Sequence, residues 1–149
     1  MAIDITATTE IDAPAAAVAE YAFEPGNDPT WIGGISSAKL LTGRPIGRGT
    51  RVQRLARFLG KTIDYVLEVV TFEPGRLMEM KSVKGPFPMI VTYRFEPDGD
   101  ARTRASVRVQ GTASGHYRIA DFLMAPMVRR NVRGDLKRLK KIIEERPYS

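Results

Sequence analysis

Few side chains in this sequence have the type and spacing that chemistry requires. Arg54 lies in an alternating run, TRVQRLARFLG, and a buried guanidinium there would bind a carboxylate or phosphate bidentately. Tyr65 and Tyr93 lie in two further alternating runs, where a hydroxyl in apolar surroundings could orient a carbonyl group or act as an acid. The only histidine, His116, has no triad or metal set near it in sequence, and we interpret it as a surface residue. The pattern favours binding over catalysis.

The composition excludes several kinds of site. The chain has no cysteine, so it has no disulfide, thiol nucleophile or thiolate metal site. The zinc-protease motif, the phosphate-binding loop and the dinucleotide-binding glycine motif are also missing. Asp98 and Asp100 belong to one hairpin turn and lack the further ligands that a metal ion requires. We therefore expect no metal and no cofactor.

The size and composition of the chain are those of an ordinary globular protein. It has 149 residues, of which 43% are hydrophobic and 27% charged, and we expect residues 1–149 to form a single domain. The first residues, MAIDITATTEI, carry acids where a signal peptide would be apolar. No apolar run reaches the length of a membrane span. We expect a cytoplasmic location.

Positive charge is concentrated near the C-terminus. The net charge is +6, and residues 116–146 hold nine Lys or Arg against four Asp or Glu. We interpret this surplus as the solvated outer face of a helix and expect no nucleic-acid partner. The same face could contact an anionic membrane surface. The sequence predicts no particular oligomeric state.

The elements that must position these residues follow from periodicity and turn signals. Residues 3–11 alternate as a half-buried strand. Two short helices follow, one starting at Pro14 and one carrying Trp31, with Asp28 as the expected N-cap of the second. About six strand-length runs separated by Gly and Pro turns occupy residues 35–113, which predicts antiparallel strands paired in sequence order.

A long C-terminal helix is predicted from about residue 117 to residue 145, because apolar residues recur there with helical spacing. One face of the sheet must be buried, and this helix is the only element large enough to cover it. The sequence therefore predicts an α+β fold, with a curved antiparallel sheet of about seven strands wrapped around the helix. The apolar face of the helix comprises Ile119, Phe122, Leu123, Met127, Val132, Leu136, Leu139 and Ile143.

The order of several segments is more specific than any one of them. They are EIDAPAAAVAEYAFEPGNDPTWIGGI, GRGTRVQ, VVTFEPGRLMEM and TYRFEPDGDARTRASV, followed by the helix DLKRLKKIIEE. Over essentially its whole length the chain resembles the START-like (SRPBCC) superfamily, nearest to its polyketide cyclase/dehydrase and lipid-transport-like branch. The resemblance implies the helix-grip fold, with a cavity for a hydrophobic small molecule between the sheet and the last helix. It implies no particular reaction, because fold does not determine function.

Two functions follow from the resemblance. The leading hypothesis is the binding of a lipid, sterol or polyketide-like molecule in the cavity. The alternative is a cyclase or dehydratase that acts on a polyketide-like substrate in the same cavity, with Tyr65 and Tyr93 as acids and Arg54 as the anchor. A third hypothesis, from another class, is an interaction module that uses the basic face of the last helix.

Alternation in the strands indicates which side chains face this cavity. In TIDYVLEVV, for example, Asp64 and Glu68 point outward, so their neighbours point inward. The cavity is expected to be lined by Trp31, Arg54, Phe58, Tyr65, Leu67, Met78, Met80, Val91, Tyr93, Phe95, Ile119, Phe122, Leu123 and Met127.

The register around Arg54 is left open by the sequence. One register turns Arg54 inward with Val52 and Ala56, and the other turns Leu55 inward with Arg57. In the first, Arg54 either binds a ligand anion or extends to water from the edge of the sheet.

Pro126 interrupts the densest apolar part of the last helix, where a proline removes one hydrogen bond. One interpretation is that the first half of the helix forms a lid over the cavity and bends at Pro126. The second half would then pack on the sheet, with Gly134 permitting close approach. The other interpretation is a tolerated kink.

Overall fold

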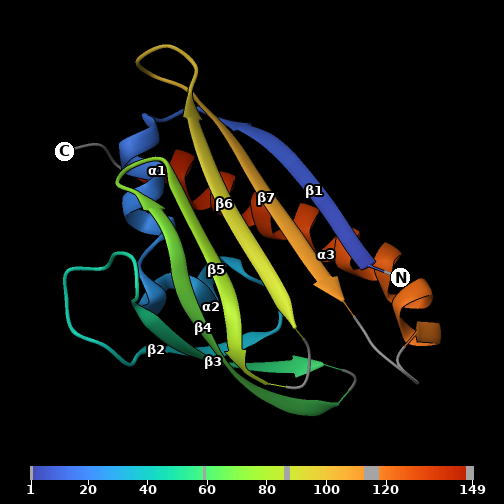
Figure 1. The fold of residues 1–149 in the computed structure, drawn as a ribbon. Helices are drawn as coiled ribbons and strands as arrows, with labels where there is room; N and C mark the ends of the chain where they lie inside the picture. The colour runs from blue at the N-terminus through green and yellow to red at the C-terminus, as the bar shows by residue number, and fades with distance from the viewer. Residues whose placement is uncertain (1, 59, 86–87, 113–117, 147–149) are drawn as a thin grey trace.

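The computed structural model describes residues 2–58, 60–85, 88–112 and 118–146, with the side chains of residues 2, 58, 112 and 118–125 left out of the description. Figure 1 shows a sheet curled around one long helix. The elements in chain order are β1 (Ala2–Ile11), α1 (Ala15–Ala22), the 3-10 turn η1 (Pro25–Asn27), α2 (Asp28–Trp31), β2 (Ile35–Leu40), β3 (Arg51–Phe58), β4 (Lys61–Glu73), β5 (Leu77–Lys84), β6 (Met89–Pro97), β7 (Thr103–Thr112) and α3 (Arg118–Glu145).

The sheet has seven antiparallel strands in the order β1-β7-β6-β5-β4-β3-β2. Strands β2 to β7 therefore pair in sequence order, and this prediction is confirmed. The first strand closes the other edge, since β1 pairs with β7 from Ala2↔Thr112 to Ile11↔Thr103. The register of β4 against β5 shifts at Val66/Leu67 and at Val69/Thr71. Such irregularities bend a strand and increase its twist, which curls the sheet toward α3.

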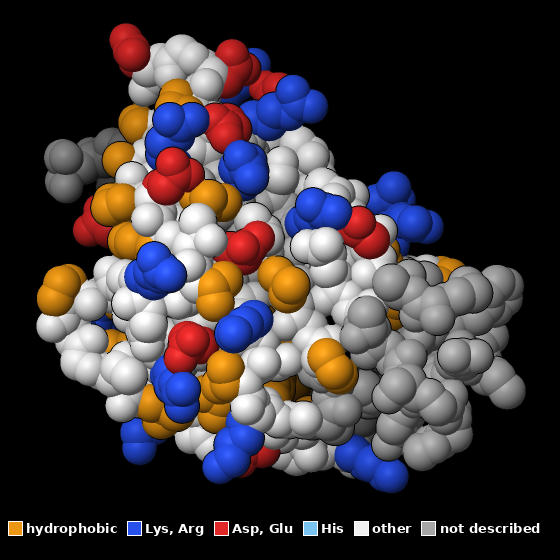
Figure 2. Space-filling model, viewed as in Figure 1, with side chains coloured by type: hydrophobic (Ala, Val, Ile, Leu, Met, Phe, Trp, Pro, Cys, Tyr) orange, Lys and Arg blue, Asp and Glu red, His pale blue; other side chains and the backbone are white. Residues whose placement is uncertain are grey.

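The two faces of the sheet differ in polarity, as alternation predicts. In β1, Ile5 and Ile11 are buried, whereas Asp4 and Glu10 point to solvent. The Asp4 carboxylate pairs with Arg108 of β7 at 2.7 Å on the outer face. Over the strands, Lys and Arg side chains lie among Asp and Glu side chains in Figure 2.

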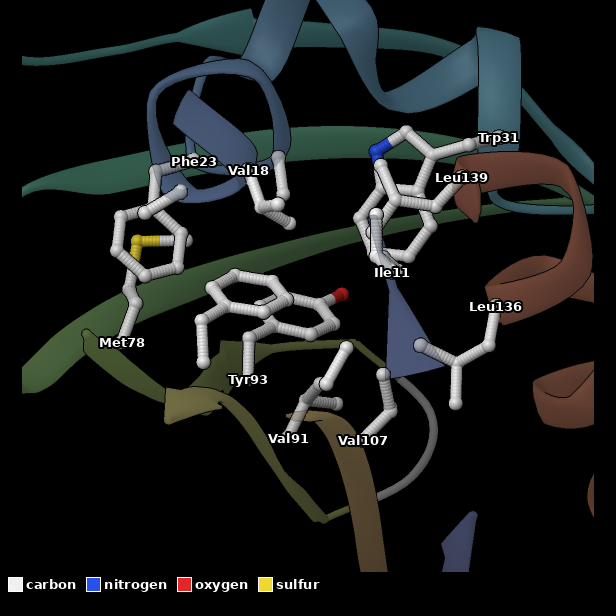
Figure 3. Close-up of a cluster of buried hydrophobic side chains, with 14 of the residues drawn as sticks. Ile11, Val18, Phe23, Trp31, Met78, Val91, Tyr93, Val107, Leu136 and Leu139 are labelled. Atoms are coloured by element: carbon white, nitrogen blue, oxygen red, sulfur yellow. The ribbon is translucent and has the colours of Figure 1, made fainter. Parts of the chain in front are cut away.

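The second half of α3 packs on the inner face of the sheet through one apolar stripe. Val132, Leu136, Leu139 and Ile143 recur at helical spacing and are all buried, as predicted. They share one core with residues of β1, α1 and the central strands (Figure 3). Within the part of the chain that the structure describes, no helix is long and apolar enough to cross a membrane.

Pro126 lies inside α3, and the helix continues on both sides of it. The role expected of Gly134 is wrong, because a Cβ at that position would meet the side chain of Arg138, at 3.6 Å from Nη1, and not the sheet. Gly134 lies two residues from both Val132 and Leu136, so it turns away from the packed stripe.

We expect Leu139→Ala to lower the free energy of unfolding by about 2–5 kcal/mol, since it leaves a cavity in the core. Leu139 is 0% exposed, whereas Leu41 is 47% exposed. The matched control Leu41→Ala is expected to change stability by less than about 0.5 kcal/mol. Urea unfolding followed by circular dichroism measures both, and equal effects would contradict the packing described for α3.

Candidate functional site

A cavity of about 540 Å³ lies between the inner face of the sheet, α3 and the segment that joins α2 to β2. Small-molecule sites in proteins have volumes of about 300–1,000 Å³ and are mostly apolar. Most of this wall is aliphatic or aromatic, and the charged groups are few. The lining residues are Trp31, Ile32, Gly33, Gly34, Ile35, Arg54, Ala56, Arg57, Ile63, Tyr65, Met89, Val91, Tyr93, Val107, Val109, Val128, Asn131, Val132, Asp135 and Arg138.

Arg54 is the buried cation in the cavity wall, and its partner is Asp28. Both side chains are only 4% exposed. Arg54 Nε donates to Asp28 Oδ2 at 3.0 Å, and Nη2 lies 2.9 Å from the same oxygen. The first of the two registers is therefore correct, with Val52 buried beside Arg54 in β3. Because Arg54 already has a carboxylate partner, a ligand anion is not needed to satisfy it.

Each member of this ion pair changes the other's pKa. Burial raises the pKa of the Asp28 carboxyl above its usual value, and Arg54 opposes this rise. Burial lowers the pKa of the Arg54 guanidinium, but Asp28, Tyr93 and Tyr65 together outweigh burial, so this pKa stands well above its usual range. The arginine therefore stays charged inside an apolar wall.

Tyr93 completes the network from β6. Arg54 Nη2 donates to the Tyr93 hydroxyl oxygen at 3.2 Å. Burial raises the pKa of Tyr93 to about 12, so the phenol is neutral at physiological pH. Since its oxygen accepts from Arg54, its own hydrogen is available to an acceptor in the cavity. The Trp31 ring packs edge-on against Tyr93, with the ring centroids 5.5 Å apart (Figure 3).

A second polar cluster joins α3 to the segment after α2, at the side of the cavity. Asp135 Oδ1 accepts hydrogen bonds from the Gly33 amide at 2.8 Å and from Arg138 Nη2 at 2.5 Å. Arg138 Nε donates in turn to the Trp31 carbonyl oxygen at 2.9 Å. A Cβ on Gly33 would lie 2.7 Å from Arg138 Nη2, so any other residue there would displace this guanidinium. Burial raises the pKa of the Asp135 carboxyl, while Gly33 and Arg138 lower it.

The structure brings five of the predicted site residues together in the cavity wall. These are Trp31, Arg54, Tyr65, Val91 and Tyr93. The side chains of four other predicted lining residues lie outside the description: Phe58, Ile119, Phe122 and Leu123. His116 lies outside the described residues altogether. The expected lid, which includes Ile119, Phe122 and Leu123, is therefore not described.

Four predicted lining residues belong to the closed core instead of the cavity wall: Leu67, Met78, Met80 and Phe95. They do face the inner side of the sheet, but Phe23, which follows α1, covers this end. Its ring lies 5.4 Å from that of Phe95 and 5.8 Å from that of Phe72. In Figure 3, Phe23 and Met78 lie toward one side of the cluster, and Trp31 and Leu136 toward the other.

Met127 is also absent from the cavity wall and is 37% exposed. The wall uses Val128, Val132 and Asp135, which recur every three to four residues on one side of α3. Met127 is one position out of this pattern and therefore points elsewhere.

Sequence reasoning missed several site residues and misassigned one. Asp28 does not act as the predicted N-cap, since α2 has Asn27 at that position and Asp28 turns inward to Arg54. The sequence feature that could have identified Asp28 was the inward register of Arg54, because a buried arginine requires an acidic partner elsewhere in the chain. Val107 and Val109 also line the cavity, and the alternation of β7 would have identified them. Nothing in the sequence points to the Gly33–Asp135–Arg138 cluster.

A curved antiparallel sheet that grips a long C-terminal helix over such a cavity defines the START-like, helix-grip class of proteins. The chain belongs to the family described as polyketide cyclase / dehydrase and lipid transport, whose profile matches residues 2–144. The family and the fold together support a cavity for a hydrophobic ligand. No curated protein matches the sequence.

Solved structures show the same fold. TTHA0849 from Thermus thermophilus is 21% identical with a TM-score of 0.80, covering 94% of this chain and 96% of that one. The Zhui aromatase/cyclase from Streptomyces sp. R1128 is 17% identical with a TM-score of 0.82, covering 98% and 96%. A START superfamily protein from Mycobacterium smegmatis is 17% identical with a TM-score of 0.72, covering 95% and 94%. At these identities the likeness concerns the fold alone.

We expect Arg54→Met to lower the free energy of unfolding by about 3–5 kcal/mol, because it leaves the Asp28 carboxylate buried without its partner. The double variant Asp28→Asn/Arg54→Met carries neither charge and is expected to be more stable than Arg54→Met alone. Arg44→Met breaks an exposed pair with Glu24 and serves as the control, with a much smaller effect. Denaturant unfolding of the four proteins measures these differences. If Arg54→Met were as stable as the control Arg44→Met, the result would contradict the buried ion pair.

Proposed function

We propose that this protein binds a hydrophobic small molecule, such as a lipid, a sterol or a polyketide-like compound, in the cavity under α3. The observation that carries the proposal is an apolar cavity of about 540 Å³ with one buried guanidinium–phenol pair in its wall. The aliphatic side chains provide the affinity, since each Å² of apolar surface removed from water contributes about 25 cal/mol. The polar pair fixes the orientation of the ligand.

The chemistry of the polar pair indicates the ligand group that meets it. Asp28 neutralises Arg54, so a ligand carboxylate would add a second negative charge to the site. A neutral acceptor, such as a carbonyl oxygen, takes the free hydrogen of Tyr93 without that repulsion. Tyr65 lies in the same wall and offers a second hydroxyl. We therefore expect a largely apolar ligand with a carbonyl or hydroxyl group at one end.

A catalytic function is the second candidate, and the likeness to the Zhui aromatase/cyclase favours it. In a cyclisation or dehydration, Tyr93 would act as the acid at a substrate carbonyl and Arg54 would stabilise the charge that develops there. The test is turnover of an aromatic polyketide substrate by the wild type and by Tyr93→Phe. If Tyr93→Phe turned the substrate over at least as fast as the wild type, Tyr93 would not be the acid.

Native mass spectrometry of the freshly purified protein tests the binding proposal. We expect an apolar adduct, or an increase in Tm with fatty acids, sterols or aromatic ketones. Val109→Phe narrows the cavity from β7 and is expected to abolish both effects. Val83→Phe is the matched control on an exposed position of β5 and should bind as the wild type does. Absence of any adduct and of any Tm shift across the ligand panel would contradict the proposal.

A further inference from the structure

The outer face of α3 carries a line of cations that the cavity does not use. Arg129, Arg133, Lys137 and Lys141 recur every four residues and are all exposed; we call them the basic stripe. At a rise of about 1.5 Å per residue, the stripe extends over about 18 Å along the helix. Arg130 adds a fifth exposed cation beside it.

Most of this charge has no acidic neighbour within the part of the chain that the structure describes, and Glu144 and Glu145 lie beside Lys137 and Lys141 only at the C-terminal end of the stripe. The stripe residues form none of the ion pairs found there. The only acid between residues 126 and 143 is Asp135, which is buried against Gly33 and Arg138. Like charges four residues apart weaken a helix. The arrangement therefore opposes helix stability and indicates an external anionic partner.

The outer face of the sheet shows the opposite arrangement. There, cations have acidic neighbours on adjacent strands, such as Arg51 with Glu68 at 3.0 Å and Arg108 with Asp4 at 2.7 Å. The basic surplus is thus a property of α3 and not of the whole surface.

The basic stripe adjoins the cavity. A groove of about 530 Å³ on α3 is lined by Arg129, Arg130, Arg133, Lys137 and other residues, none of them acidic. Asn131 and Arg138 line both this groove and the cavity. A surface that binds the stripe would therefore lie next to the cavity.

We propose that the basic stripe docks the protein onto an anionic membrane surface, with the cavity beside the lipid. A line of flexible cations along one helix matches a layer of anionic headgroups. Residues 126–143 contain no aromatic side chain on which nucleic-acid bases could stack. Because docking depends on charge alone, it can be tested without knowledge of the ligand.

The test is co-sedimentation with vesicles of phosphatidylcholine alone and of phosphatidylcholine mixed with phosphatidylserine. We expect binding to the mixed vesicles only, weakening as salt is raised. The triple variant Arg129→Gln, Arg133→Gln, Lys137→Gln is expected to lose about 100-fold in affinity, since each cation near an anionic surface contributes about fivefold. The control Lys61→Gln, Lys81→Gln, Lys84→Gln removes the same charge from exposed positions of the sheet and should retain wild-type binding.

Three results would overturn the proposal. The first is no binding to the mixed vesicles. The second is an equal loss of affinity in the two triple variants, which would assign binding to net charge. The third is binding of duplex DNA, abolished by the α3 variant, with no binding of vesicles, which would assign the stripe to nucleic acid.

Discussion

Burial of the Arg54 guanidinium in an apolar wall is the constraint on which the arrangement of the site depends. An unpaired charge in such surroundings costs several kcal/mol, so its partners must come from other elements. Asp28 comes from α2 and Tyr93 from β6. The short helix α2 therefore has a role beyond local packing, because it carries the carboxylate that allows a cation to stay inside. The neighbouring Trp31 then packs on Tyr93 and holds its ring in place.

The long helix serves three purposes with three of its sides. One stripe, which includes Leu136 and Leu139, is fully buried and fixes the helix on the sheet. A second side, with Val128 and Asp135, faces the cavity and is tied to the segment after α2 through Gly33. The third side is the basic stripe. The spacing of about 3.6 residues per turn places the three patterns on different sides of one helix.

Much of the fold could be predicted from the sequence because it depends on local periodicity. Alternation gave the strands and the inner face, and turn residues gave the antiparallel order. The inner face alone does not separate core from cavity, since the burial of Phe95 depends on Phe23, which is distant in sequence. The role of Asp28 also could not be predicted locally. Its neighbours in sequence indicate a helix start, whereas its partner Arg54 lies 26 residues away. Long-range packing decided both cases.

Under the proposed function, the cavity wall, and not the outer surface, contacts an apolar ligand. A carbon-13 methyl NMR titration of valine-labelled protein with an aromatic ketone measures this directly. We expect the methyl signals of Val91, Val107 and Val109, which line the cavity, to shift together and saturate. The signal of the exposed Val83 should stay unchanged. Shifts at Val83 with none at the three cavity valines would contradict the account.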